Sequence, residues 1–344
     1  MRNDHDLAFL LRYENIAWYD NGQVRMLDRR FYPTEERFVT CRTYQEVAKA
    51  ISDMVTQSYG PFQAVYAGMA LAAHACAHLQ AEEQLAYLKA AADCLATARP
   101  TTERKMRVIS DACEQVAKDA LTCGESAALA LQNAMLEWLE ARYARIAKIG
   151  RFLAEKIPKG GTLLSMCYPD CDYGMTLRAC RELGNDVKLI CPETRPYFQG
   201  AKLTASVAYD MGFDVTVITD NMPAWTMATK PIDVFMTAAD VITVDGHIVN
   251  KVGTFQVALA ARHFGIPYYC TGNPNAVHPT IAGIRIEERD PEEVKHALGL
   301  PTCKAGVKAY YPAFDITPPE LVTGVVTDKG ILAPDQLQRY FAGE

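Results

Sequence analysis

The spacing of apolar residues divides the chain into two parts. In the first part, apolar positions recur at helical intervals within segments rich in Ala, Leu, Glu and Lys that contain few Gly or Pro residues. The pattern predicts long helices at residues 62–80, 82–98, 102–121 and 124–157. We therefore expect this part to form a mainly helical domain.

Two local signals precede these helices. Segment 16–27 has two alternating arms around Asn21-Gly22, which is a strong indication of a β hairpin. Thr43-Tyr44-Gln45-Glu46 has the form of a capping box, and apolar residues follow it at helical spacing. A small hairpin and a short helix are therefore expected ahead of the long helices.

The second part begins after KIPKGGT (156–162), where Pro and two Gly residues interrupt the helical pattern. Short, fully apolar segments then alternate with helical ones, and the strands are predicted at 162–167, 187–191, 214–219, 233–239 and 266–271. Alternation of this kind is typical of a parallel sheet covered on both faces. An inserted hairpin is expected at 241–249. The fold class is thus α/β, with a helical N-terminal domain (1–155) and a Rossmann-like domain with a mostly parallel sheet (156–344).

Composition excludes several function classes. The net charge of −6 comes from 35 basic and 41 acidic residues that are mixed along the 344-residue chain, so no basic stretch suits nucleic acid. No apolar run approaches the roughly 18 residues of a membrane span, and the N-terminus lacks the pattern of a secretory signal. The eleven cysteines are scattered without a CxxC pair. This favours reduced thiols in a cytoplasmic protein.

One cysteine lies where chemistry is expected. Cys167 ends the predicted strand 162–167, and open α/β sheets bind ligands at the carboxyl ends of their strands. A zinc site with Cys171 would need a second ligand pair, and a redox pair usually has two intervening residues, not three. Taken alone, Cys167 is interpreted as a buried structural thiol. His74 and His78 are interpreted as ordinary helix residues, so no metal site is predicted.

Two further stretches change this interpretation. CPETRPYFQGAKLTA (191–205) presents Gln199 where the next helix begins, and such a helix start is a natural anion site. MTAADVITVDGHIVNKVGT (236–254) places Asp240 after a strand and Asn250 and Lys251 just before a helix, an arrangement that favours phosphate. Together these segments bring a thiol, a carboxylate and an anion site to the same edge of the sheet.

At these residues the chain resembles the methylthioribose-1-phosphate isomerase family. The shared motifs include WYDNGQVRMLDRRFYP, ARPTTE, ETRPYFQGAKLTA, VITDNM, NKVGT, IRIEERDPEEV and YPAFDITPPELVTGVVTDKGIL, which span nearly the whole chain. The resemblance implies a homodimer in methionine salvage that isomerises a 5-substituted ribose 1-phosphate, foremost 5-methylthioribose 1-phosphate, without a metal or organic cofactor. It further implies Asp240 as the acid, Cys167 at C2 as either a thiolate base or an uncharged wall for a hydride shift, and phosphate ligands at Arg99, Gln199, Asn250 and Lys251.

Departures from the family pattern leave the substrate open. Gln57 stands where isomerases of the family carry a phosphate-loop arginine, and Tyr168-Pro169-Asp170 replaces small residues after Cys167. Another pentose 1-phosphate, such as 5-deoxyribose 1-phosphate or ribose 1,5-bisphosphate, is therefore an alternative substrate. A non-catalytic subunit that senses a sugar phosphate or nucleotide is the competing class.

Overall fold

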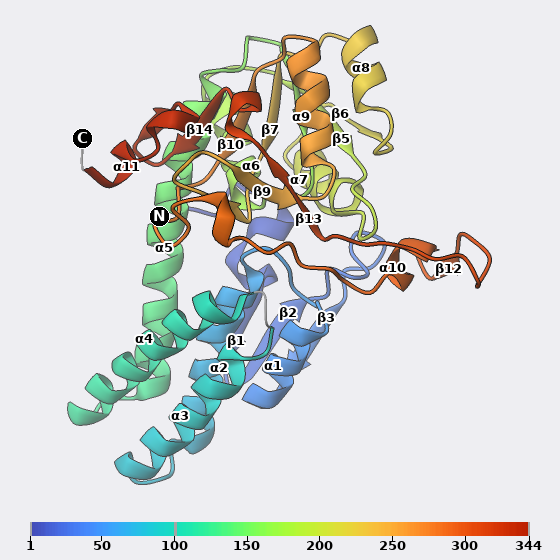
Figure 1. Ribbon diagram of the computed structural model, residues 1–344. Helices are drawn as coiled ribbons and strands as arrows, with labels where there is room; N and C mark the ends of the chain where they lie inside the picture. Colours follow the sequence, from blue (N-terminus) through green and yellow to red (C-terminus); the bar gives the residue numbers. More distant parts are fainter. Residues whose placement is uncertain (1, 100–101, 343–344) are drawn as a thin grey trace. The chain divides into compact units, whose positions relative to one another are not determined.

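The computed structural model describes residues 2–99 and 102–342 (Figure 1). The chain divides into two compact units, Met1–Ala144 (unit 1) and Arg145–Glu344 (unit 2). The division falls inside the long helix α5 (Ala127–Ala154), whereas the boundary expected from the sequence lay just beyond the end of this helix.

Unit 1 contains a three-stranded antiparallel sheet in the order β1-β2-β3. The predicted hairpin is confirmed: β1 (Ala17–Asp20) and β2 (Gln23–Leu27) meet at Asn21 and Gly22, whose φ angles of 45° and 79° are those of the tight turn that suits twisted strands. β3 (Phe38–Cys41) was not predicted, because four residues of mixed polarity carry almost no periodic signal.

The helices of unit 1 pack around α2. The expected elements are found as α1 (Tyr44–Ser52), α2 (Gly60–Cys76), α3 (Ala81–Ala96) and α4 (Glu103–Thr122), with short 3₁₀ turns η1 (Phe9–Leu11) and η2 (Tyr13–Asn15) before them. Helix α2 is buried along nearly its whole length and contacts α1, α3, α4 and β1. Gly68 permits this packing, because a Cβ atom there would lie 3.0 Å from Leu95 and 3.1 Å from Val47.

The capping box at Thr43 is present in altered form. The hydroxyl of Thr43 accepts a hydrogen bond from the Glu46 N–H at 3.2 Å. The Glu46 carboxylate accepts one from the Arg42 N–H at 2.6 Å, one residue earlier than the reciprocal pattern requires. The cap therefore starts α1 at the predicted place.

Unit 2 is built on a seven-stranded sheet in the order β15-β14-β10-β7-β4-β5-β6. The strands are β4 (Thr162–Ser165), β5 (Lys188–Pro192), β6 (Val215–Ile218), β7 (Val234–Thr237), β10 (Tyr268–Thr271), β14 (Gly324–Thr327) and β15 (Gly330–Leu332). All pairs are parallel except β14 with β15. This confirms the mostly parallel sheet, and its strand order reverses direction between β4 and β7, as in dinucleotide-binding folds.

Four main helices cover this sheet. They are α6 (Cys171–Glu182), α7 (Ala205–Asp210), α8 (Pro223–Thr229) and α9 (Thr254–His263). Helix α6 packs with α7, and α8 packs with α9. Right-handed crossovers place the two pairs on opposite faces of the sheet, because the strands progress in opposite directions from β4. A π-helical segment, η4 (Gly200–Thr204), leads into α7.

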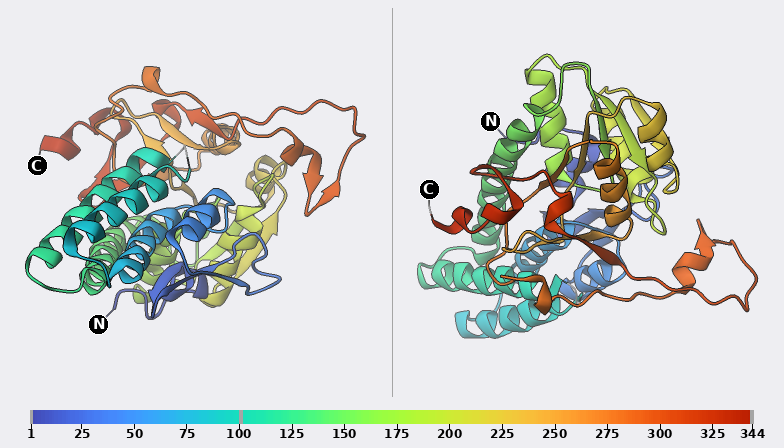
Figure 2. Two further views of the ribbon diagram at one scale, coloured as in Figure 1. Left: turned by 90° about the horizontal axis from the view of Figure 1, so that it is seen from below. Right: turned by 45° about the horizontal axis from the view of Figure 1, so that its top comes forward.

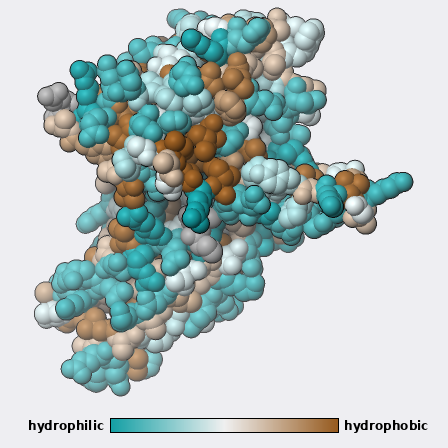
Figure 3. Space-filling model, viewed as in Figure 1, coloured by the Kyte–Doolittle hydropathy of each residue, from teal (hydrophilic) through white to brown (hydrophobic). Residues whose placement is uncertain are grey.

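A second small sheet, in the order β13-β9-β8, lies beside the main one. The expected hairpin is confirmed as β8 (Val241–Ile242) and β9 (Ile248–Lys251), and β13 (Phe314–Thr317) pairs antiparallel with β9. Apolar side chains gather on the surface in the region of β9 and β13 (Figure 3). The third strand was not predicted, because its partner lies more than sixty positions away in the sequence.

Residues 288–312 form an arm that projects from unit 2 (Figure 2). Its stem is closed by a bridge between Glu288 and Pro312. It contains α10 (Glu292–Lys295), β11 (His296–Ala297) and β12 (Leu300–Pro301), while η5 (Ile281–Gly283), η6 (Pro319–Leu321), η7 (Pro334–Gln336) and α11 (Arg339–Ala342) complete the unit. Across residues 2–99 and 102–342, no helix is both long and apolar enough to cross a membrane.

Candidate active site

Cys167 and Asp240 follow the two strands at which the sheet order reverses. Cys167 comes two residues after β4, Asp240 comes three residues after β7, and β4 pairs directly with β7. Ligands of open α/β sheets bind at this switch point, beyond the carboxyl ends of the strands. The order of the strands therefore gives both residues a common location that their sequence positions alone do not.

The loops around Cys167 are held in unusual backbone conformations. Cys167 itself has a φ of 63°, and Thr194 and Phe198 on the loop after β5 also have positive φ angles. The Cys167 N–H donates to the Thr194 hydroxyl at 3.2 Å, and the Thr204 hydroxyl donates to the Cys167 carbonyl. Such strain persists only where the surroundings enforce it, and it concentrates at functional sites.

The half-buried Cys167 side chain is protonated at neutral pH. Burial raises the pKa of its thiol to about 11, the Lys251 ammonium opposes this rise, and the Asp240 carboxylate adds to it. Reactive cysteines have lowered pKa values, so this environment does not produce a thiolate. The same interactions indicate that Cys167, Lys251 and Asp240 lie within electrostatic reach of one another.

The Asp240 side chain is exposed. Its backbone N–H donates to the Val249 carbonyl at 2.9 Å, which fixes the loop between β7 and β8 against β9. The carboxylate is thus presented at the strand end without being enclosed by apolar groups.

Lys251 on β9 is a buried positive charge. Its side chain is only 4 % exposed, and the ammonium lies 5.8, 5.7 and 5.0 Å from the ring centres of Tyr197, Tyr311 and Phe314. Among residues 2–99 and 102–342, no side chain or carbonyl accepts a hydrogen bond from this ammonium. A buried ammonium beside aromatic faces, without a hydrogen-bond acceptor, is an attractive site for an anion.

The charge balance around Lys251 strengthens this attraction. Burial lowers the pKa of Lys251, and the nearby Arg289 guanidinium lowers it further, while the Asp240 and Glu287 carboxylates raise it. Arg289 is itself paired with Glu287, with its Nε 2.8 Å from Oε1 and its Nη2 3.2 Å from Oε2. A dianionic phosphate beside Lys251 would relieve the unfavourable burial of positive charge.

Gln199 also has an unfulfilled hydrogen-bonding atom. Its side chain is 8 % exposed, and its amide oxygen has no hydrogen-bond partner in the described part of the chain. Asp220 holds the loop that carries it, because its carboxylate accepts the N–H groups of Thr194 and Arg195 at 2.7 Å each. Buried polar atoms are rarely left without a partner, so this one is suited to a ligand hydroxyl or, with the amide reversed, to a phosphate oxygen.

Asn250 and the start of α9 were expected to bind phosphate, but both already have hydrogen-bond partners within the protein. The Asn250 amide donates to the Thr254 hydroxyl at 3.0 Å. The first N–H groups of α9 already have an anion: Asp315 accepts from Gly253 at 2.6 Å and from Phe255 at 3.2 Å. Asp315 was not predicted, because it reaches α9 through the pairing of β13 with β9.

The other two expected residues lie in unit 1. Arg99 is half-buried after α3, and its carbonyl accepts the Thr102 N–H at 3.2 Å. Gln57 is half-buried in the turn between α1 and α2, where its carbonyl accepts from Arg29 Nη1 at 2.8 Å. The remaining five expected residues all belong to unit 2.

The cysteines and histidines show no metal-binding arrangement. None of the eleven cysteines forms a disulfide, and Cys171 is buried at the start of α6. His74 and His78 are both exposed. Within residues 2–99 and 102–342, no group of three His, Cys, Asp or Glu residues could hold a metal ion.

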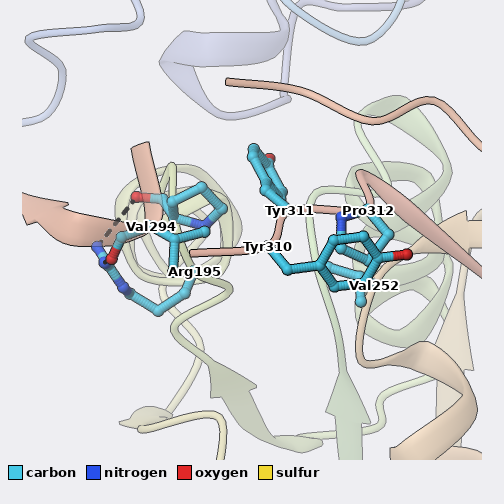
Figure 4. A pocket seen from close by; sticks show the side chains of 7 residues that line it. Arg195, Val252, Val294, Tyr310, Tyr311 and Pro312 are labelled. Carbon is cyan, nitrogen blue, oxygen red and sulfur yellow. Dashed lines mark hydrogen bonds between the residues drawn. The ribbon is translucent and has the colours of Figure 1, made fainter. Parts of the chain in front are cut away.

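A cavity of about 160 Å³ is lined in part by Tyr311, one of the aromatic residues around Lys251 (Figure 4). Arg195 and Val294 line one side, and Val252, Tyr310 and Pro312 line the other. Arg195 holds the arm there, since its Nη2 donates to the carbonyls of Val294 and His296 at 3.0 and 2.8 Å. Pro196 and Tyr311 complete the lining of the cavity.

The chain belongs to the Initiation factor 2 subunit family, whose model matches residues 62–334. Within this family it is similar to enzymes named methylthioribose-1-phosphate isomerase. The protein from Thermosipho africanus is 35 % identical over 94 % of this chain and 96 % of its own length, and that from Anaeromyxobacter dehalogenans is 37 % identical over 91 % and 92 %.

Two solved structures have the same fold. The 5-methylthioribose 1-phosphate isomerase from Pyrococcus horikoshii superposes with a TM-score of 0.86 at 27 % identity and full coverage of both chains. The delta subunit of the translation initiation factor eIF-2B from A. fulgidus gives 0.80 at 30 % identity, over 93 % of this chain and 96 % of its own.

Proposed function

We propose that this protein is an aldose–ketose isomerase that converts a 5-substituted ribose 1-phosphate, foremost 5-methylthioribose 1-phosphate, into the ribulose 1-phosphate. The observation that carries the proposal is the buried Lys251 ammonium. It has no hydrogen-bond acceptor in the described part of the chain and lies within electrostatic reach of Cys167 and Asp240. The names of the most similar relatives support the same reaction.

In this proposal the phosphate is bound mainly by side chains. Lys251 supplies the charge, and Gln199 and Asn250 supply amide hydrogen bonds. The resemblance implies Arg99 as a further ligand. Because Asp315 already accepts the first N–H groups of α9, the helix start itself is not free for the phosphate. Fixing the phosphate orients C1 and C2 for the reaction, which is the positioning contribution to catalysis.

The chemistry requires ring opening without a free anomeric hydroxyl, because the phosphate ester blocks that oxygen. Asp240 gives a proton to the ring oxygen as its bond to C1 breaks, which leaves C1 electron-deficient. The hydrogen on C2 then moves to C1 with its electron pair, and the C2 hydroxyl loses its proton as the ketone forms. Burial keeps Cys167 protonated, with a pKa of about 11, which supports the uncharged wall over the thiolate base.

To act as the acid, Asp240 must be protonated before the reaction. Its carboxyl must hold a proton near neutral pH, and this requires an apolar, water-poor surrounding. Because the side chain is exposed, we propose that bound substrate supplies part of that cover. A substrate that lacks an apolar 5-substituent would then be turned over more slowly.

The test is a panel of pentose 1-phosphates assayed for ketose formation. It contains 5-methylthioribose 1-phosphate, 5-deoxyribose 1-phosphate and ribose 1,5-bisphosphate, with the Cys167→Ser protein as the blank. We expect the methylthio compound to be isomerised fastest. If no compound gives a ketose although the protein binds them, the competing assignment as a sugar-phosphate or nucleotide sensor replaces this one.

We also propose that the protein is a cytoplasmic homodimer, as the family resemblance implies. The eleven cysteines without a disulfide agree with a reducing compartment. Sedimentation velocity at micromolar concentration would give a monomer mass if the dimer is wrong.

A further inference from the structure

The Tyr311 hydroxyl is a buried polar group that the mechanism above does not use. The side chain is 3 % exposed, and its hydroxyl has no hydrogen-bond partner of normal geometry in the described ranges, although the Arg289 side chain lies close enough to interact with it. A buried hydroxyl without a partner destabilises the folded protein. The neighbouring Tyr310, by contrast, is 68 % exposed.

The surroundings of Tyr311 are those of the anion site. Its ring centre lies 5.7 Å from the Lys251 ammonium and 6.5 Å from the ring centre of Tyr197. The Arg289 N–H donates to the Tyr311 carbonyl at 3.0 Å, which ties the two residues together at the stem of the arm. Burial raises the pKa of Tyr311 to about 12, with the Arg289 guanidinium opposing this rise and the Glu293 carboxylate adding to it.

These neighbours determine how the hydroxyl can act. A phenol with a pKa of about 12 keeps its proton at neutral pH and therefore serves as a donor. The positive charge of Arg289 favours the orientation in which the phenol oxygen faces the guanidinium and its proton faces away. An acceptor is then needed on the remaining side. Glu293 is the carboxylate already near this hydroxyl, and the Lys251 ammonium favours a bound anion as a further acceptor.

We propose that the Tyr311 hydroxyl donates a hydrogen bond to the phosphate monoester held at Lys251, which makes it a further substrate-binding residue. This inference rests on the proposed anion site. Tyr311 would give the phosphate a neutral donor in addition to the expected amides of Gln199 and Asn250. This chain has Gln57 where isomerases of the family carry a phosphate-loop arginine, so an additional donor would offset part of that loss.

Orthophosphate is the probe that tests this contact independently of turnover. We expect Tyr311→Phe to weaken orthophosphate binding, followed by ³¹P NMR titration, at least about fivefold. The Tyr209→Phe protein, whose tyrosine is 76 % exposed on α7, is the matched control and should bind as the wild type does. Because Phe removes a buried hydroxyl without a partner, the Tyr311→Phe protein should unfold at the same or higher urea concentration, which separates lost binding from lost folding.

Kinetics with the best pentose 1-phosphate provides the second measurement. KM should rise by a similar factor while kcat changes less than about twofold, because a phosphate contact is made equally in the ground and transition states. Should Tyr311→Phe bind orthophosphate as tightly as the wild type while Lys251→Met does not, the inference is wrong. A wild type that binds no orthophosphate overturns it as well. A wild type that binds orthophosphate at Lys251 but isomerises no sugar phosphate overturns only the proposed function.

Discussion

Replacing Lys251 with methionine should make the protein more stable and abolish its phosphate binding. The ammonium is 4 % exposed and is compensated by three aromatic rings at 5.0 to 5.8 Å. Each ring lies near the roughly 6 Å limit of such contacts and contributes between about 0.5 and 2 kcal/mol, whereas removing an ammonium from water costs of order 20 kcal/mol in the idealised limit and several kcal/mol after relaxation. Methionine has a similar length, adapts to irregular spaces and packs well against aromatic rings. We expect Lys251→Met to raise the free energy of unfolding by about 1–3 kcal/mol.

The pH dependence of this difference tests its electrostatic origin. Because burial lowers the pKa of Lys251, the unfolded chain binds more protons than the folded one at alkaline pH. Wild-type stability should therefore rise relative to Lys251→Met as the pH increases toward the unfolded pKa of about 10.4. The charged or titratable groups around the ammonium, Cys167, Arg289, Asp240 and Glu287, are unchanged in the variant.

Urea unfolding measured by fluorescence can isolate unit 2. Of the three tryptophans, Trp225 lies on α8 in unit 2, so a background with Trp18 and Trp138 replaced by Phe reports on that unit. Orthophosphate at a hundred times its dissociation constant should stabilise the Lys251 protein by about 2.7 kcal/mol and leave the variant unchanged. The reasoning is refuted if Lys251→Met is clearly less stable than its parent, or if phosphate stabilises both proteins equally.

Three further predictions concern single residues. Cys167→Ser and Asp240→Asn should each lower kcat at least about a hundredfold, while Cys171→Ser should have little effect; equal losses from both cysteines would point to a shared role of the two thiols. Burial raises the pKa of Asp315 to about 6, so the folded state binds the extra proton and stability falls as pH rises from about 4 to 6; Asp315→Asn should remove up to about 3 kcal/mol of that dependence in urea titrations. Gln57→Arg should lower KM about tenfold, because charge-assisted hydrogen bonds are roughly twice as strong as neutral ones; an unchanged KM would mean that this turn does not face the phosphate.

Local patterns predicted the fold where neighbouring residues determine it. The Asn21-Gly22 hairpin and the strand that ends before Cys167 depend on residues next to one another in the chain, so their periodicity was visible. The strand order, which gives Cys167 and Asp240 adjacent strand ends, was not predicted, because the pattern along the chain shows strands but not which of them pair.

Long-range contacts account for what the sequence did not predict. The rings around Lys251 come from Tyr197, Tyr311 and Phe314, which lie more than fifty positions away in the chain. Asp315 reaches the start of α9 only because β13 pairs with β9. No periodic pattern signals such encounters, because each segment satisfies its own local preferences without them.

The arm offers a place to open the polypeptide without dismantling unit 2. Its tip is solvent-exposed, with Leu298 and Leu300 at 80 % and 70 % exposure, while the stem is closed by the bridge from Glu288 to Pro312. A break near residue 300 would leave a C-terminal fragment that still supplies β13, β14 and β15 to their partner strands. Two separately expressed pieces should therefore reassemble by strand pairing, and the arm is the natural junction for a split reporter or a circularly permuted version of this protein.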